Sequence, residues 1–103
     1  MFQTKILVLE EDGLCYMDYS GDNRVLPDAR IMNDQSMTVE KCQNFCFSSG
    51  YQFAGVEFSR ECWCGNQRPE DERPAEECGM TCTGDETQIC GDRWRINVYS
   101  RNQ

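Results

Sequence analysis

The sequence contains no histidine, and this absence removes several kinds of catalytic and metal site. A serine or cysteine nucleophile paired with a histidine base cannot form, and a mixed cysteine–histidine zinc site has no histidine ligand. The eight cysteines include no C-x-x-C pair, which argues against a free-thiol redox site. C-x3-C occurs twice, but C-x-C is a poor chelating spacing. We therefore expect no bound metal and no cofactor.

The chain also lacks long hydrophobic runs and an excess of positive charge. Its longest apolar run, residues 6–9, is too short for a bilayer span or for the core of a signal peptide. Lys and Arg number 10 against 18 Asp and Glu, so the net charge is −8. An acidic surface repels phosphate backbones and anionic headgroups. We expect no nucleic-acid partner and no membrane contact by this domain.

Cysteine, in contrast, is abundant. Eight cysteines in 103 residues is an even number close to the density of a disulfide scaffold, and the length suits a single domain. Such a density is typical of secreted chains, because cytosolic thiols are kept reduced. The core of a domain this small is modest, and cross-links would supplement it. We expect a monomeric extracellular module whose signal has been removed or lies on a larger parent protein.

The clearest element is a helix that begins after Thr38 and ends before Gly50. Thr38 can cap its N-terminus, and Gly50 suits the position after its C-terminus. Strands are predicted at 51–58, 62–64 and 95–99. Residues 5–9 are either a short strand or a disordered leader, residues 24–35 read as irregular, and residues 66–77 read as a charged loop.

The spacing of four cysteines connects the helix to a strand. Cys42 and Cys46 share one face of the helix about 6 Å apart, and Cys62 and Cys64 share one face of a strand roughly 6.6 Å apart. Two parallel bridges can therefore clamp the helix onto the strand in either of two registers. The other four cysteines would pair among themselves in one of three ways: Cys15, Cys78, Cys82 and Cys90.

Several motifs together resemble the WSC domain family over about residues 14–99. They are Met37-Thr38-Val39-Glu40-x-Cys42-x-x-x-Cys46, Gly50-Tyr51-x-Phe53-Ala54-Gly55-Val56-Glu57-Phe58, Arg60-Glu61-Cys62-Trp63-Cys64-Gly65-Asn66, Cys78-x-Met80-x-Cys82-x-Gly84, Ile89-Cys90-Gly91 and Arg95-Ile96-Asn97-Val98-Tyr99. The resemblance divides the chain into residues 1–13, an N-terminal extension or edge strand, and residues 14–103, the WSC domain. The sequence departs from the family pattern at Leu14, and at Asp92 and Trp94 before the last strand.

The resemblance implies an α+β fold: a small disulfide-rich domain similar to the apple/PAN type, with an antiparallel sheet cradling one helix. It also implies the pairing Cys15–Cys78, Cys42–Cys62, Cys46–Cys64 and Cys82–Cys90. WSC domains are regarded as carbohydrate-binding modules of fungal cell-wall sensors and secreted enzymes, and fungal β-glucan is the usual proposed ligand.

Sugar rings stack on exposed aromatic side chains, so the aromatic residues are the first site candidates. Alternation places Trp63 opposite the helix, either exposed or in a second small cluster under a loop. Tyr19 lies next to the polar turn pattern Gly21-Asp22-Asn23, which favours exposure, and Tyr51 opens a strand. Trp94 is also a binding candidate, although its shared parity with Ile96 and Val98 favours the core. Phe45, Phe53 and Phe58 are assigned to packing.

Hydroxyl groups of a sugar need polar partners beside these rings. The polar candidates are Asp18, Arg60 and Asn66, followed by Glu61 and Arg95. For each of them alone, a solvated surface position is the simpler explanation. A glycosidase would need two tuned carboxyl groups in a cleft that a chain this short hardly builds.

The leading function is therefore a non-catalytic carbohydrate-binding module for cell-wall polysaccharide, with β-1,3-glucan as the expected ligand. The alternative is an extracellular protein-interaction module of apple/PAN type. A linear row of exposed aromatic side chains favours the first, and one compact apolar patch favours the second.

Overall fold

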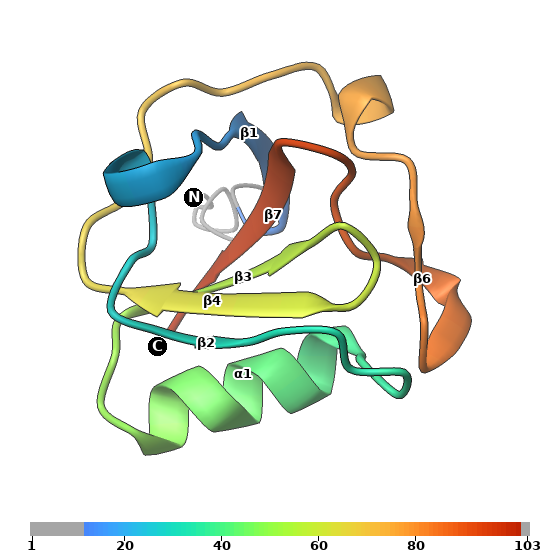
Figure 1. Cartoon of the computed structure of the whole chain (residues 1–103), viewed down its shortest axis with the longest axis horizontal. Coiled ribbons are helices and arrows are strands. Elements are labelled where there is room, and N and C mark those ends of the chain that lie inside the picture. Colours follow the sequence, from blue (N-terminus) through green and yellow to red (C-terminus); the bar gives the residue numbers. More distant parts are fainter. Residues whose placement is uncertain (1–11, 102–103) are drawn as a thin grey trace, which may run out of the picture.

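A five-stranded antiparallel sheet is the centre of the computed structural model, which describes residues 12–101. The strand order is β1-β7-β3-β4-β2 (Figure 1). The strands are β1 (Leu14–Met17), β2 (Ala29–Ile31), β3 (Phe53–Glu57), β4 (Glu61–Gly65) and β7 (Arg95–Ser100). The α+β fold expected from the sequence is confirmed. The strand or leader considered at 5–9 lies outside the described residues.

The predicted helix is α1 (Val39–Ser48), which lies along one face of the sheet (Figure 1). The Thr38 hydroxyl accepts a hydrogen bond from the Lys41 N–H at 3.0 Å, as expected of an N-cap. The chain leaves the helix through Gly50, whose φ of 93° is a conformation that glycine adopts without steric cost.

The structure contains short elements that the sequence patterns did not predict. A second sheet is the hairpin of β5 (Thr81–Cys82) and β6 (Asp85–Ile89), and β2 lies within the segment predicted to be irregular. Two turns of 3₁₀ helix, η2 (Gly21–Asn23) and η3 (Ala75–Glu77), interrupt the loops. These elements have two to five residues each, too few for a hydrophobic period to be recognised.

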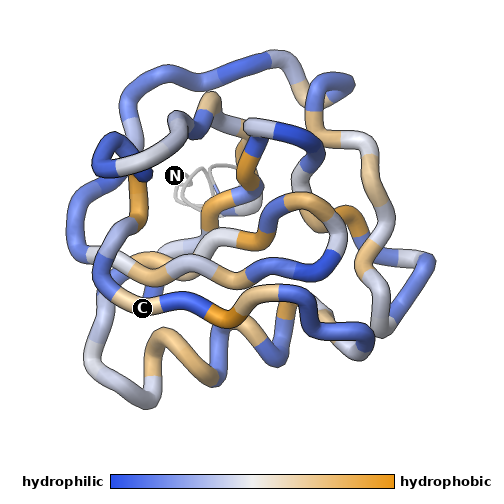
Figure 2. The backbone as a smooth tube through the Cα atoms, in the orientation of Figure 1, coloured by the Kyte–Doolittle hydropathy of each residue, from blue (hydrophilic) through white to orange (hydrophobic). Residues whose placement is uncertain are grey.

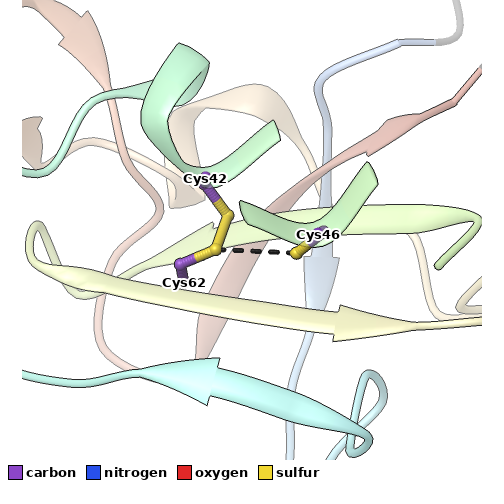
Figure 3. Close-up of side chains that lie close together, drawn as sticks. All are labelled: Cys42, Cys46 and Cys62. Atoms are coloured by element: carbon purple, nitrogen blue, oxygen red, sulfur yellow. Dashed lines mark hydrogen bonds between the residues drawn. A yellow bond between two sulfur atoms is a disulfide. The ribbon is translucent and has the colours of Figure 1, made fainter. Parts of the chain in front are cut away.

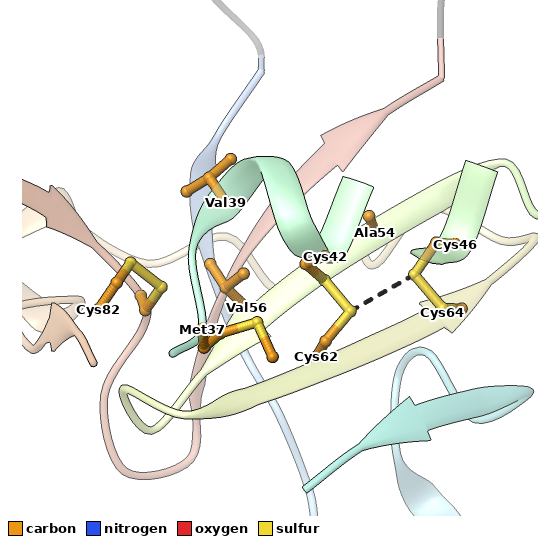
Figure 4. Close-up of a cluster of buried hydrophobic side chains, with 10 residues drawn as sticks. Met37, Val39, Cys42, Cys46, Ala54, Val56, Cys62, Cys64 and Cys82 are labelled. Carbon is orange, nitrogen blue, oxygen red and sulfur yellow. Dashed lines mark hydrogen bonds between the residues drawn. A yellow bond between two sulfur atoms is a disulfide. The ribbon is translucent and has the colours of Figure 1, made fainter. Parts of the chain in front are cut away.

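The layer between α1 and the sheet is a cluster built largely from half-cystines (Figure 4). Its buried members are Met37, Val39, Cys42, Cys46, Ala54, Val56, Cys62, Cys64, Cys82 and Cys90. Two bridges join the helix to β4: Cys42–Cys62 and Cys46–Cys64. The other two are Cys15–Cys78 and Cys82–Cys90, so the pairing implied by the family resemblance is confirmed.

A second cluster lies on the face of the sheet opposite α1. It consists of Tyr16, Leu26, Trp63, Ile96 and Val98. Leu26 belongs to the segment between η2 and β2, which crosses this face and packs against Gly55 and Gly65. A Cβ atom at Gly55 would collide with Ile96 and Leu26, so glycine makes the close approach possible. Figure 2 shows mostly hydrophilic outer loops and hydrophobic stretches in the strands.

Candidate functional site

A small open hollow lies on the face opposite α1, where β3 ends and β4 and β7 begin. Its volume is about 240 Å³. The lining residues are Arg24, Glu57, Phe58, Glu61, Arg93 and Trp94. It combines two aromatic rings with two guanidinium groups and two carboxyl groups, the side-chain types that contact a sugar.

Arg24 is the central residue of this hollow. Its guanidinium carbon lies 4.1 Å from the ring centre of Trp63 and 5.0 Å from that of Trp94. The same guanidinium donates to Asp18 Oδ2 at 2.8 Å and lies 3.4 Å from Glu57 Oε2. One cation therefore joins a buried indole, an exposed indole and two buried carboxyl groups.

The two carboxyl groups differ in charge. Burial, then the hydrogen bond to Asp18 and the negative charge of that residue, raise the pKa of Glu57 to about 10. Burial opposes the ionisation of Asp18, but hydrogen bonds from Glu57, the Val25 N–H and Arg24 outweigh it and lower the pKa of Asp18. Among the described residues no donor reaches Glu57 Oε1, which fits a carboxyl group that carries its own proton and donates it to Asp18.

Trp94 forms the exposed aromatic side of the hollow, and the prediction that it lies in the core is wrong. Its side chain is 41% exposed, and its φ is 58°. A turn closed by the Asp92–Arg95 bridge precedes β7, and the Trp94 carbonyl accepts the Asp18 N–H at 3.1 Å. The left-handed backbone breaks the alternation of β7, so the parity with Ile96 and Val98 does not extend to Trp94.

Trp63 lies on the face opposite the helix, as alternation predicted, but it is only 3% exposed. Of the two possibilities left open, the second cluster under a loop is confirmed. The segment that carries Leu26 covers the ring, and Arg24 and Arg30 flank it. Its indole N–H donates to Glu61 Oε1 at 3.0 Å, so Trp63 supports a residue of the hollow rather than offering a free face.

Three predicted residues lie elsewhere on the surface. Tyr19 is exposed, as expected, and its hydroxyl donates to Asp71 in a neighbouring hollow. Asn66 is exposed beside Arg24, in another shallow hollow, and accepts the Gln52 N–H. Tyr51 packs against the helix-side cluster, away from these two hollows.

Asp18, Arg60 and Phe58 lie in or next to the hollow, whereas Arg95 forms an ion pair with Glu77. Asp18 is almost completely buried and holds Arg24 by an ion pair. Arg60 stacks on Phe58 with 5.2 Å between its guanidinium carbon and the ring centre. Phe58 is half-buried, has a φ of 53° and lines the hollow, so its assignment to core packing is wrong. It follows the last residue of β3, where alternation no longer applies.

Arg24, which organises the hollow, is not among the residues predicted from the sequence. Arg24 lies in a segment predicted to be irregular, and nothing in its neighbourhood distinguishes it from other surface arginines. The position of Glu57 in the sequence could have indicated the site. Its parity with Gly55 and Phe53 places a carboxyl group inside a strand, on the face of the second cluster. A carboxyl group buried there requires a partner, and arginine is the usual one.

The described residues include one group that resembles a metal site by distance alone. The sulfur atoms of Cys42, Cys46 and Cys62 lie within 4.8 Å of one another. Cys42 and Cys62 are joined by a disulfide, and Cys46 Sγ lies 3.7 Å from Cys62 Sγ (Figure 3). Cys46 is bonded to Cys64, so the closeness comes from two adjacent bridges and offers no thiolate ligand.

Taken together, the fold and the hollow define a class: a small disulfide-stapled α+β module of extracellular type, with a shallow polar and aromatic surface site. Within residues 12–101, no helix is long and apolar enough to cross a membrane. The sequence profile of the WSC domain matches residues 13–92, so the chain belongs to the WSC domain family.

Relatives of this chain occur in fungi and animals. A WSC domain-containing protein of Arthroderma benhamiae is 48% identical over 68 residues, which cover 62% of this chain and 7% of that protein. The xylosyltransferase oxt of Drosophila melanogaster is 34% identical over 82% of this chain and 10% of its own length. Kremen protein 1 of Mus musculus is 33% identical over 82% of this chain and 18% of its own length. The domain is thus a minor part of each of these proteins.

Proposed function

We propose that this domain is a non-catalytic carbohydrate-binding module that recognises cell-wall polysaccharide, with β-1,3-glucan as the leading ligand. The observation that carries the proposal is the hollow, in which the exposed Trp94 ring stands beside Arg24, Glu61 and Arg93. An apolar ring face would stack on the indole, while its hydroxyl groups bond to the guanidinium and carboxyl groups.

The same residues argue against catalysis by the domain. Asp18 and Glu57 are hydrogen-bonded to each other and both contact Arg24. Hydrolysis of a glycosidic bond requires two carboxyl groups that flank the bond from different sides. The pair in this domain instead fixes the position of Arg24.

The hollow is open and small, so a single domain binds weakly. A few stacking contacts, each worth about 1 kcal/mol, must offset the freedom lost on association. Affinity for one site should lie in the high-micromolar to millimolar range. A polymer offers many overlapping sites, and several modules on one parent protein would add avidity. Because the proposed ligand is a cell-wall polymer, the module acts outside the cell, secreted or on the cell-wall side of a larger protein.

The test is a pull-down on insoluble β-1,3-glucan, chitin, xylan and cellulose, side by side, with bovine serum albumin as a control for unspecific retention. Retention on β-1,3-glucan above the control supports the proposal, and competition by soluble β-1,3-glucan should release the domain. Failure to bind all four polymers, together with stoichiometric binding to a secreted protein, would favour the protein-interaction module instead.

A further inference from the structure

Building on the proposed carbohydrate function, we infer that the hollow recognises acidic sugar units, and that Arg93 determines this preference by binding the carboxylate of a hexuronate. Such a unit is a pyranose ring whose primary alcohol group is oxidised to a carboxyl group. Arg60 stands beside Arg93 and adds positive charge. Three features of this rim support the inference: two stacked guanidinium groups, their lack of ion pairs, and the backbone conformation of Phe58.

Phe58 carries two arginine side chains on its ring. The guanidinium carbon of Arg60 lies 5.2 Å from the ring centre, and that of Arg93 lies 5.8 Å from it. Phe58 and Arg93 both line the hollow. A stacked guanidinium group keeps its N–H donors in its own plane, where they can bind a carboxylate in bidentate geometry. The ring thus orients Arg93 before a ligand arrives, which reduces the entropy lost on binding.

The charges of Arg60 and Arg93 are not offset within the described part of the chain. Neither residue takes part in an ion pair there, and Arg60 Nε is buried without a hydrogen-bond partner. Arg24 differs from both, because the carboxylate of Asp18 offsets its charge. A buried or stacked cation without a partner gains most from a ligand that supplies the missing anion.

The acidic groups around this rim are already engaged. Glu61 Oε1 accepts an indole N–H at 3.0 Å. The carboxylate of Asp92 accepts the backbone N–H groups of Gly79 at 3.3 Å and of Arg93 at 2.7 Å. Burial raises the pKa of Glu57, so this group is neutral and adds no negative charge. Although the whole chain has a net charge of −8, the rim therefore keeps two guanidinium groups available to an anion.

The backbone at the tip of the β3–β4 hairpin supports a binding role for Phe58. φ is 53° at Phe58 and 72° at Ser59, in the left-handed region where Gly, Asn and Asp are the usual residues of hairpin turns. A phenylalanine is an outlier there, and its ring is only half-buried, so folding alone favours another residue. Outliers of this kind concentrate at binding sites, and this one brings the ring that carries the two arginines to the rim of the hollow.

A hexuronate suits this arrangement because one unit offers both an apolar ring face and an anion. The ring can stack on the exposed Trp94 indole while the carboxylate bonds to Arg93, since both residues line the same hollow. A hydrogen bond between charged groups is roughly twice as strong as one between neutral groups. An acidic unit therefore gains more from Arg93 than a hydroxyl group does, and salt should weaken this gain because the hollow is open to solvent.

The experiment compares soluble β-1,3-glucan with the same polymer after its primary alcohol groups have been oxidised to carboxylates, so that the linkage is kept and only the charge is added. A third polymer, β-1,3-glucan with one sulfate ester per unit, offers a different oxyanion. Binding of the wild type, Arg93→Gln and Arg60→Gln is measured by microscale thermophoresis, and melting temperatures report on folding. Arg68→Gln is the matched control, because Arg68 is exposed and stacks on Phe53 at 5.0 Å but lies outside the hollow.

We expect the wild type to bind the oxidised polymer about tenfold more tightly than the parent glucan at low salt. This ratio should shrink when the salt concentration rises from about 50 mM to about 500 mM. Arg93→Gln should reduce the ratio to about twofold, Arg60→Gln should reduce it in part, and Arg68→Gln should keep it. All three variants should keep the melting temperature within about 5 °C of the wild type.

Two results overturn the inference while leaving the proposed function intact: equal binding of the oxidised and parent polymers by the wild type, or an equal loss of the ratio in Arg93→Gln and Arg68→Gln. Tighter binding of the sulfated polymer than of the oxidised one would assign the rim to sulfate esters, and the hexuronate assignment would be wrong. Binding of the oxidised polymer alone, lost in Arg93→Gln, supports the inference and rejects neutral β-1,3-glucan as the ligand. If the wild type binds none of the polymers, the proposed function and the inference both fail.

Discussion

Asp18 and Arg24 form a 2.8 Å ion pair in which the carboxylate is almost completely buried and the guanidinium retains some contact with solvent. Asp18 also accepts hydrogen bonds from the backbone N–H groups of Tyr19 and Val25. The pair therefore links the chain on both sides of η2 to the hollow. The hydrogen bonds from Tyr19, Arg24 and Val25 to this buried carboxylate fix the path of the chain through η2.

Replacing Arg24 with methionine should lower the free energy of unfolding by roughly 3 kcal/mol, because it leaves a buried carboxylate without its cation. Arg68→Met is the matched control: Arg68 is exposed and stacks on Phe53 at 5.0 Å, without an ion pair among the described residues. Urea unfolding followed by fluorescence measures both. Equal losses in the two variants would show that the Asp18–Arg24 pair contributes nothing specific.

Glu57→Gln should flatten the dependence of stability on pH. The pKa of Glu57 is raised from 4.5 to about 10 in the folded state, so the folded protein holds a proton that the unfolded chain releases. Wild-type stability should therefore fall as the pH rises from about 5 to 8, and this fall should be smaller in Glu57→Gln. Melting temperatures at pH 5 and pH 8 provide the comparison.

Asp34→Asn is the control for this experiment. A hydrogen bond with Lys41 lowers the pKa of Asp34, so its contribution to stability is lost only as the pH falls below the usual range of an aspartate. Between pH 5 and pH 8 the Asp34→Asn variant should keep the wild-type slope. A Glu57→Gln variant with that same slope would mean that Glu57 is ionised in the folded protein.

Trp63→Ala should cost about 4 kcal/mol, because it removes a large buried side chain from the second cluster. Trp94→Asn serves as the comparison, since it changes the other tryptophan of the chain at an exposed position. Thermal and urea unfolding should separate the two variants clearly. A cost below about 1 kcal/mol for Trp63→Ala would contradict its placement under the Leu26 segment.

Removing the Cys15–Cys78 bridge by a double change to alanine should cost about 4 kcal/mol, against about 2.5 kcal/mol for Cys82–Cys90. The reason is loop length: the first bridge joins residues 63 apart in sequence and the second joins residues 8 apart. Urea unfolding of both double variants tests the order. The intact protein should show no thiol that reacts with Ellman's reagent after denaturation, and two or more reactive thiols would contradict the four-bridge pairing.

Those parts of the fold that depend on local regularity could be predicted from the sequence. Thr38 and Gly50 mark the helix ends by their backbone chemistry, and the matching spacings of Cys42/Cys46 and Cys62/Cys64 indicate a helix clamped onto a strand. The register of that clamp came from the resemblance to WSC domains, because spacing alone allows both registers.

The hollow could not be predicted, because it depends on contacts between segments that are distant in sequence. Trp63 is covered by Leu26, and Trp94 is stacked on Arg24, in each case by a residue from the irregular segment before β2. Alternation assigns a side chain to a face of the sheet but does not say what crosses that face. It also ends with the strand, which is why it misplaced both Phe58 and Trp94.

The two ends of strand β7 have different neighbours, and this difference matters for attaching the domain to a surface. At one end, the Ser100 N–H donates to Asp12 at 2.8 Å, so the chain enters and leaves the fold side by side. The other end of the strand, about 17 Å away at the usual rise, is Arg95, which directly follows Trp94. A tether at either flank would therefore attach the domain at the end of β7 that is remote from the hollow, which suits immobilisation on a sensor chip or fusion to a reporter protein.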